Sequence, residues 1–112
     1  MKAPLEPGDI APDFTATAVG GRHGEGEIFT LSSCFGTKVI LYFYPKDDTP
    51  GCTAQACGIR DNHSAFLLKG ALIYGISVDS PSSHARFIAK HALPFPLISD
   101  EDRCIVESYG VW

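Results

Sequence analysis

The sequence predicts an α/β domain built around a mostly parallel sheet. Three runs of aliphatic, β-branched and aromatic residues, at 38–44, 71–78 and 95–99, are typical of strands that are covered on both faces. Stretches of helical character separate these runs. Because strands in the order strand, helix, strand, helix, strand are joined by right-handed crossovers, we expect the three strands to lie parallel.

The segment before the first buried run is rich in turns. It contains two short extended stretches, at 14–19 and 27–31, on either side of a glycine-rich loop at 20–26. The loop lacks the Gly-Lys-Ser/Thr of a phosphate-binding loop, and no buried strand precedes it. We therefore expect a flexible connection here and no nucleotide site.

Each buried run ends at a residue that stops a strand, and helical material follows it. Pro45 ends the first run, and the helical stretch 52–69 then ends at Gly70. A second helix is expected over 82–92, with an apolar stripe of Ala85, Ile88 and Ala92 beside Phe87 and His91. A last helix is expected over 101–109, with Cys104, Ile105 and Tyr109 on one side.

Length and composition allow one domain, residues 1–112, and exclude several classes of function. With 45% hydrophobic and 20% charged residues, the composition is that of an ordinary globular domain. The net charge of −4 and the lack of a basic run argue against nucleic-acid binding. No apolar stretch approaches the ~20 residues of a membrane span, and the first residues lack the apolar part of a secretory signal. We expect a cytoplasmic protein that binds neither membrane nor nucleic acid.

Four cysteines occur in a chain that has aliphatic strands to bury: Cys34, Cys52, Cys57 and Cys104. They are too few for a disulfide-stabilised scaffold, and in a reducing cytoplasm such residues are catalytic, bind a metal or fill the core. The Cys-x4-Cys spacing is not that of a zinc knuckle, and no two histidines fall at ligand spacing. We therefore expect no zinc site, and we interpret the four histidines as surface polar residues. Cys34 and Cys104 are interpreted as core residues.

Cys52 follows a loop at the carboxyl end of a strand, where the functional residues of open α/β sheets lie. The loop 45–51 comes directly after the carboxyl end of the first buried strand and opens a helix. Near a helix N-terminus, free backbone N–H groups and the helix dipole favour the thiolate over the thiol. Thr49 can direct its hydroxyl at the sulfur or at an oxygen bound to it, and Pro45 and Pro50 stiffen the loop.

These residues carry a family resemblance. The pattern Pro45-x-x-x-Thr49-x-x-Cys52 resembles the peroxidatic motif of peroxiredoxins, and residues 8–14, GDIAPDF, resemble their N-terminal signature. The longer string 42–57, YFYPKDDTPGCTAQAC, is similar to the bacterioferritin-comigratory, or Q-type, branch. The resemblance runs from about residue 8 to residue 112 and implies a thioredoxin-like fold.

The resemblance implies a thiol-dependent peroxidase that acts on hydrogen peroxide and organic hydroperoxides. In that family Cys52 would be the peroxidatic nucleophile, Thr49 a hydrogen-bond partner of peroxide and thiolate, and Pro45 a shield. Cys57 would be the resolving cysteine, which forms a disulfide with oxidised Cys52. Thioredoxin or a similar dithiol would reduce that disulfide, and no metal, haem or flavin is required.

The spacing of the two cysteines has a mechanical consequence. In an intact helix, five residues separate Cys52 and Cys57 by ~7.5 Å along the axis and ~140° around it, which places their Cα atoms roughly 8–9 Å apart. A disulfide usually needs a Cα separation below about 7 Å. If the two cysteines bond, the first turns of the helix must unwind, and Gly51 and Gly58 make unwinding easier.

The chain departs from the family pattern near its C-terminus. Peroxiredoxins carry an arginine on a later strand, and none of the four arginines has that place in the pattern: Arg22, Arg60, Arg86 and Arg103. The chain also ends where Q-type relatives continue for two further strands and a helix, and these would flank the 39–44 strand. We therefore expect that strand to be an open edge through which the chain can self-associate.

Two interpretations stay open at this point. Arg60 either forms an ion pair with Asp61 on the helix surface or faces the cysteine site. For the whole chain, the alternative to a peroxidase is a non-catalytic remnant whose cysteine pair still oxidises, so that it acts as a redox-responsive binding module.

Overall fold

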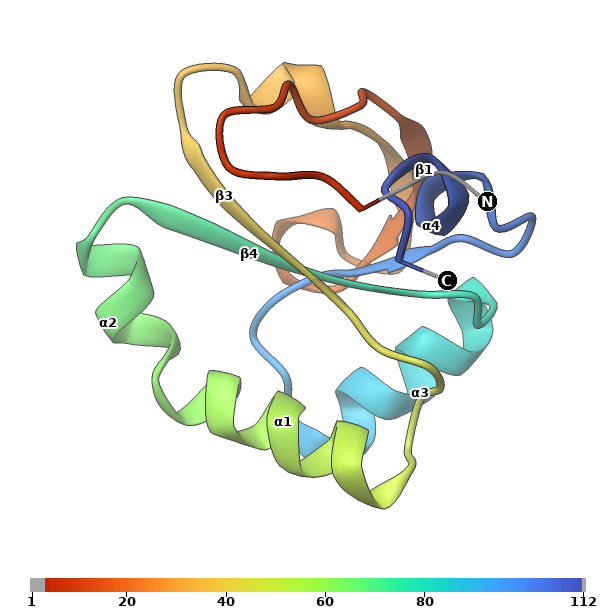
Figure 1. Cartoon of the computed structure of the whole chain (residues 1–112). Helices are drawn as coiled ribbons and strands as arrows, with labels where there is room; N and C mark the ends of the chain where they lie inside the picture. Colours follow the sequence, from red (N-terminus) through yellow and green to blue (C-terminus); the bar gives the residue numbers. More distant parts are fainter. Residues whose placement is uncertain (1–3, 112) are drawn as a thin grey trace.

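The computed structural model describes residues 4–111 and contains a five-stranded sheet with the order β2-β1-β5-β4-β3 (Figure 1). Three strands lie parallel, as the sequence predicts: β3 (Lys38–Phe43), β4 (Ala71–Ser77) and β5 (Leu97–Ser99). The two expected N-terminal segments extend this sheet, with β1 (Thr15–Val19) antiparallel to β5 and to β2 (Glu27–Thr30). The sheet of this thioredoxin-like fold is therefore mixed, and its parallel half leads into the predicted site.

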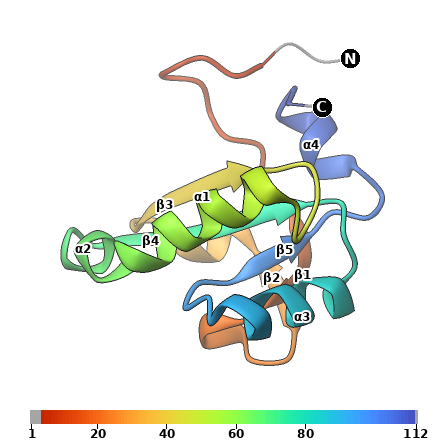
Figure 2. The ribbon, with the colours of Figure 1, turned by 90° about the horizontal axis from the view of Figure 1, so that it is seen from below.

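The helices follow the strands in the predicted order. α1 (Pro50–Asp61) and α2 (His63–Leu68) follow β3, α3 (Pro81–His91) follows β4, and α4 (Cys104–Ser108) follows β5. Two 3₁₀ turns, Gly21–His23 and Leu31–Cys34, lie in the N-terminal segment. α1 and α3 cover one face of the sheet, while the chain before β1 and α4 lie on the other (Figures 1 and 2). Within residues 4–111, no helix combines the length and apolar character needed to cross a bilayer.

Each face of the sheet has its own hydrophobic core, because successive residues of a strand point to opposite faces. In β4, Tyr74 and Ile76 belong to the core on the α4 side, whereas Ile73 belongs to the core beneath α1 and α3. In β5, Ile98 and Leu97 divide in the same way. The nearly continuous apolar character of β4 and β5 therefore reflects burial on both faces, as predicted, whereas β3 is only partly buried.

The last helix is shorter than the sequence predicts. The carboxylate of Asp100 accepts the backbone N–H groups of Ile105 (3.0 Å) and Val106 (2.9 Å), which starts the helix only at Cys104. Its buried side is formed by Ile105 and Val106. The prediction of a core role for Cys104 is wrong, because its side chain is exposed. The same prediction for Cys34 is confirmed, since that side chain is buried in the core on the α4 side.

The buried side of α3 is not the predicted stripe. Ala85 and Ala92 are exposed, whereas His84 and Phe87 are buried. His23 is buried as well, so the prediction of surface histidines is wrong for two of them. Burial is tolerated because both rings have hydrogen-bond partners inside the protein.

A glycine in β4 allows a close approach across the parallel strands. Gly75 is the register partner of Tyr42 in β3 and of Leu97 in β5. A Cβ atom at Gly75 would lie 2.7 Å from Leu97 Cδ2 and 2.8 Å from Tyr42 Cζ, closer than real contacts allow. The absence of a side chain at Gly75 is therefore what allows the Tyr42 ring to lie across the sheet on the α1 side.

We expect Gly75→Ala to lower the free energy of unfolding by about 1–3 kcal/mol, because the added methyl group overlaps two packed side chains. Denaturation in urea measures the change. Gly58→Ala in α1 is the control, since no atom lies within 4 Å of its added Cβ and alanine is the better helix former. Equal stability of Gly75→Ala and wild type would contradict the packing described for Tyr42.

Candidate active site

Cys52 lies in the first turn of α1, as predicted. Thr49 is the N-cap residue, with an extended backbone (φ −89°, ψ 153°), and Pro50 is the first helical residue. The carbonyl oxygen of Thr49 accepts the N–H of Thr53 at 2.8 Å, which closes the first turn. The N–H groups of such a turn have no acceptor four residues earlier in the helix and favour negative charge nearby.

The thiol of Cys52 is almost completely buried, with 9% of the residue exposed. It belongs to the core beneath α1 and α3, together with Tyr44 and Phe87. Tyr42 packs against this core, and its hydroxyl is buried with no hydrogen-bond partner among the described residues. Burial raises the pKa of Tyr42, and the charges of Asp47 and Cys52 act in the same direction. Tyr42 therefore remains a neutral phenol, with an unused donor close to the cysteine.

Thr49 and Pro45 lie in the loop between β3 and α1. The Thr49 hydroxyl donates to the carbonyl oxygen of Lys46 at 3.0 Å, so in this structure its proton closes the loop. Pro45 is exposed and lines a cavity of about 280 Å³ together with Phe43 and Val106. Both residues are thus near the start of α1, and the Thr49 hydroxyl is bonded to Lys46 and not to the Cys52 sulfur, so their roles toward peroxide stay predictions.

Cys57 lies on the same helix as Cys52 and is half-buried, and both thiols are free. α1 is continuous over both residues, so the separation expected for an intact helix applies. Arg60, close by, pairs with Asp61 (3.0 Å) and donates to the carbonyl oxygen of His91 in α3 (2.8 Å). The hydrogen bond with Asp61 raises the pKa of Arg60, and the Cys57 charge adds to this effect. Of the two interpretations left open for Arg60, the structure shows the ion pair with Asp61, and Arg60 also links α1 to α3.

A buried carboxylate in the same loop is the functional feature that the sequence analysis missed. Asp47 is 7% exposed and accepts hydrogen bonds from Tyr44 Oη (2.5 Å), Ser83 Oγ (2.8 Å) and the His84 ring (2.7 Å). Its own N–H donates to Asp79 at 2.7 Å. Burial acts to raise the pKa of Asp47, but the hydrogen bonds from its donors outweigh burial and hold the pKa below its usual value. Asp47 is therefore ionised at neutral pH.

His84 connects this loop to the sheet. Its side chain is completely buried, with Nδ1 at 2.7 Å from Asp47 Oδ2 and Nε2 at 3.0 Å from the carbonyl oxygen of Ile98 in β5. The sequence held one signal of this burial, because His84 precedes Phe87 and Ile88 by three and four residues and so shares their helix face. Nothing in the sequence identified Asp47 as its partner.

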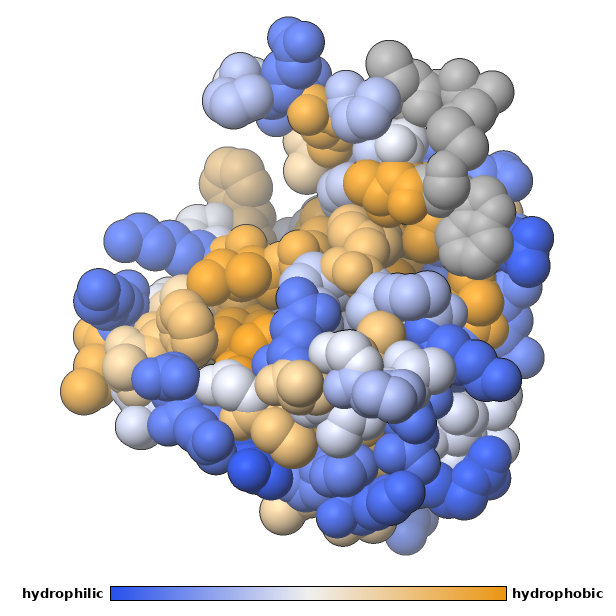
Figure 3. All heavy atoms as spheres, turned by 60° about the horizontal axis from the view of Figure 1, so that its bottom comes forward, coloured by the Kyte–Doolittle hydropathy of each residue, from blue (hydrophilic) through white to orange (hydrophobic). Residues whose placement is uncertain are grey.

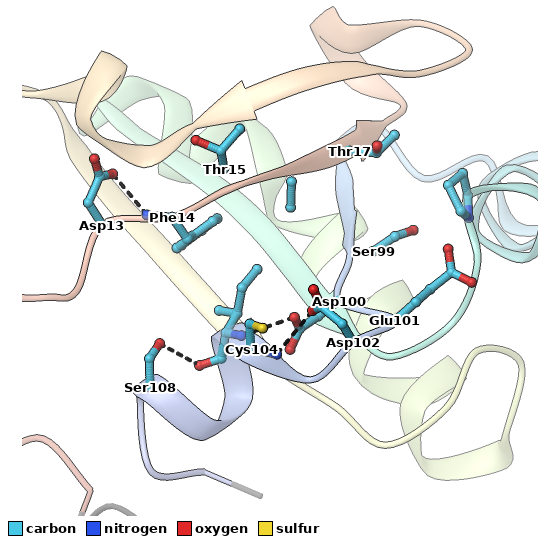
Figure 4. Close-up of a pocket in the computed structure, with 13 residues that line it drawn as sticks. Asp13, Phe14, Thr15, Thr17, Ser99, Asp100, Glu101, Asp102, Cys104 and Ser108 are labelled. Carbon is cyan, nitrogen blue, oxygen red and sulfur yellow. Dashed lines mark hydrogen bonds between the residues drawn. The ribbon is translucent and has the colours of Figure 1, made fainter.

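A second cavity, of about 610 Å³, opens between β1 and α4 (Figure 4). Two of its acidic residues accept backbone hydrogen bonds: Asp100 accepts the N–H groups at the start of α4, and Asp102 accepts the N–H of Cys104 at 3.1 Å. The hydrogen bond with Asp102 and the charge of that carboxylate raise the pKa of the Cys104 thiol, which disfavours a thiolate there. Across residues 4–111, no three His, Cys, Asp or Glu side chains are grouped so as to hold a metal ion.

Comparison with known proteins finds close relatives. The sequence profile of the AhpC/TSA family matches residues 7–112. The chain is 46% identical over 109 residues to peroxiredoxin Bcp of Escherichia coli K12, which covers 97% of this chain and 67% of that protein. It is 44% identical over 108 residues to peroxiredoxin Bcp of Bacillus subtilis 168, covering 96% and 66% of the two chains.

A solved structure gives the same result. The bacterioferritin comigratory protein of Xanthomonas campestris, whose structures concern its alkyl peroxide reduction activity, superposes with a TM-score of 0.81 at 35% identity. The superposition covers 88% of this chain and 59% of the Xanthomonas chain. The chain thus spans between 59% and 67% of the length of these three relatives.

We expect Asp47→Asn to lower the free energy of unfolding at pH 7 by about 3–5 kcal/mol, because removal of one partner leaves the other charge of a buried pair uncompensated. The folded chain holds the pKa of Asp47 below its ordinary 3.8, so the stability that its charge supplies is present above about pH 4 and is lost as the pH falls further. Acid unfolding followed by circular dichroism measures both effects.

The control is Asp48→Asn, which removes an exposed pair with Lys90 from the same loop and is expected to change stability little. A variant Asp47→Asn that unfolds like wild type, both at pH 7 and in acid, would show that the buried carboxylate does not stabilise the fold.

Proposed function

Because the chain belongs to the AhpC/TSA family of peroxiredoxins, we propose that it is a thiol-dependent peroxidase in which Cys52 reduces hydrogen peroxide and organic hydroperoxides. The place of Cys52 carries the proposal: it is a nearly buried thiol in the first turn of a twelve-residue helix, directly after the loop that contains Pro45 and Thr49. The dipole and the free N–H groups of that turn stabilise negative charge on sulfur. The alkyl peroxide reduction named for the Xanthomonas protein supports the substrate class.

The proposed first step is a displacement at a peroxide oxygen. The Cys52 thiolate attacks the terminal oxygen of ROOH, the S–O bond forms as the O–O bond breaks, and ROH leaves after taking up a proton. Sulfur is oxidised to sulfenic acid as the peroxide is reduced. The Thr49 hydroxyl, which donates to the carbonyl oxygen of Lys46 in this structure, turns to the peroxide in this step. Pro45 shields the reacting thiolate from water.

Cys57 resolves the sulfenic acid. Because α1 keeps the two cysteines apart, its first turns unwind before the Cys57 thiol attacks the Cys52 sulfur. The attack forms the Cys52–Cys57 disulfide and releases water. Thioredoxin or a similar dithiol then reduces that disulfide by exchange, and the cycle uses no metal or organic cofactor. Free cysteines and a dithiol partner fit a reducing compartment such as the cytoplasm.

We expect Cys52→Ser to abolish peroxide consumption, because a serine hydroxyl is almost fully protonated at neutral pH and does not cleave an O–O bond reductively. Cys57→Ser should consume one equivalent of peroxide, stop at sulfenic acid and proceed to sulfinic acid under excess oxidant. Peroxide consumption coupled to thioredoxin and its reductase measures turnover of both variants. The mass of the intact protein shows the oxidation state of the cysteines. Wild type should lose 2 Da after one equivalent.

Cys104→Ser is the matched control, since that thiol is exposed and its neighbouring carboxylate disfavours the thiolate. It should leave turnover unchanged. Turnover by Cys52→Ser would disprove the assignment of the nucleophile. A wild-type chain that forms the disulfide but does not turn over would support the redox-responsive binding module instead.

We also propose that β3 pairs with β3 of a second copy. Among the described residues this strand pairs only with β4, which leaves the N–H and C=O groups of its other side available to a partner strand. Ile40 within β3 and Phe35 just before it are 41% and 97% exposed. Hydrophobic side chains also gather in a band on the face shown in Figure 3. An apolar open edge of this kind favours association.

Ile40→Lys is expected to shift the chain from dimer toward monomer, because a charge on an edge strand opposes strand pairing. Sedimentation velocity at several concentrations measures the shift. Leu68→Lys, at an exposed position in α2 away from β3, should leave the association unchanged. A wild-type chain that is monomeric at every concentration would contradict the proposed pairing.

A further inference from the structure

The hydrogen-bond geometry around His84 favours a ring that is protonated on both nitrogens. The carbonyl oxygen of Ile98, at 3.0 Å from Nε2, can only accept a hydrogen bond, so Nε2 carries a proton. Asp47, at 2.7 Å from Nδ1, also accepts from the Tyr44 and Ser83 hydroxyls. An ionised carboxylate among these donors requires a proton on Nδ1 too. This arrangement suits a doubly protonated His84, a buried imidazolium that donates to both acceptors.

The groups that face this imidazolium come from several elements. Asp47 lies in the loop, and Tyr44, at the end of β3, has its hydroxyl at 3.4 Å from Nδ1. Asp79, after β4, is one step further away, because it accepts the N–H of Asp47 and the hydroxyl of Ser77. β5 contributes a backbone carbonyl, so among these neighbours Asp47 supplies the charge opposite His84.

The ion pair between Asp47 and His84 holds the loop that precedes Cys52, the predicted nucleophile. Asp47 lies two residues before Thr49, the N-cap residue of α1, and five residues before Cys52. The Thr49 side chain makes no capping hydrogen bond to α1, because its hydroxyl is directed at Lys46. The start of α1 thus depends on the loop in front of it, and the loop is fixed by Asp47 to α3 and, through His84, to β5.

We propose that the His84 imidazolium is a positioning residue that keeps the first turns of α1 wound through its ion pair with Asp47. The proposal rests on the proposed roles of Cys52 and Cys57, since disulfide formation requires those turns to unwind. The pair opposes unwinding in the reduced chain and so delays the disulfide after oxidation. Loss of either charge shifts the loop and the first turns of α1 toward the unwound state.

The first test reads the charge of His84 in the reduced wild-type chain. Nitrogen NMR of a histidine-labelled sample at pH 7.5 should show both ring nitrogens of His84 in the protonated form, assigned by the loss of their signals in His84→Gln. A merely structural, neutral histidine would show one protonated and one unprotonated nitrogen. That result would overturn the proposal, and the measurement needs no peroxide.

The second test measures amide hydrogen exchange in the loop and the start of α1 by mass spectrometry. It compares His84→Gln and Asp47→Asn with wild type. Removal of one partner of a buried pair should raise exchange in 45–56 by about 100-fold or more, so that in these variants 45–56 is less protected than β4. Lys90→Gln is the matched control, because it removes an exposed ion pair between the same helix and the same loop. It should change exchange less than about threefold.

The outcomes of these tests are decisive in either direction. Unchanged exchange in 45–56, or protection of 45–56 equal to that of β4 in the variants, would overturn the positioning role. If His84→Gln does not fold, exchange in Asp47→Asn still tests the pair.

The third test connects the pair to the chemistry. After equal peroxide exposure, His84→Gln should hold several-fold more disulfide relative to Cys52 sulfinic acid than wild type, because its α1 unwinds sooner. An unchanged ratio would overturn the link to resolution. A wild-type chain that consumes no peroxide would instead overturn the proposed function, while the NMR and exchange results would still decide whether His84 holds the loop.

Discussion

The buried carboxylate of Asp47 is the constraint around which the reactive end of the molecule is arranged. A charge removed from water is stable only when donors surround it, and Asp47 receives them from Tyr44 at the end of β3 and from Ser83 and His84 in α3. These donors come from segments that are distant in the chain. The need of Asp47 for hydrogen-bond donors therefore holds the end of β3 close to the start of α3. This arrangement positions the start of α1, and with it Cys52.

Two cysteines in the first turns of helices show why that surrounding structure matters. Cys52 begins a twelve-residue helix and is packed among apolar side chains, whereas Cys104 begins a five-residue helix and is hydrogen-bonded to Asp102. The longer helix supplies the larger favourable field, and the carboxylate beside Cys104 opposes a thiolate. A helix N-terminus alone therefore does not make a cysteine reactive. Its neighbours decide which of the two thiols is suited to react with peroxide.

The parallel core and the start of α1 could be predicted from the sequence because their signals are local. Apolar runs end at strand-breaking residues, and Thr49 and Pro50 mark the beginning of a helix. His84 could not be placed correctly, because its partner Asp47 lies 37 residues away in the chain and only the folded structure brings the two together. Cys104 was misplaced for a different, local reason, since the side chain of Asp100, four residues earlier, sets the start of α4.

The proposed chemistry requires the first turn of α1 to be wound in one step and unwound in the next. The restraint on this turn lies in the preceding loop and not in the helix itself. Reaction with peroxide requires a wound first turn around Cys52, whereas the disulfide requires that turn to open. In α3 the N-cap side chain of Ser80 accepts the N–H of Ser83, but Thr49 gives α1 no such cap. A strong cap would oppose unwinding within the helix itself. Because the restraint is instead the ion pair of Asp47 in the preceding loop, the first turn of α1 has little stabilisation of its own. The loop then determines whether that turn unwinds.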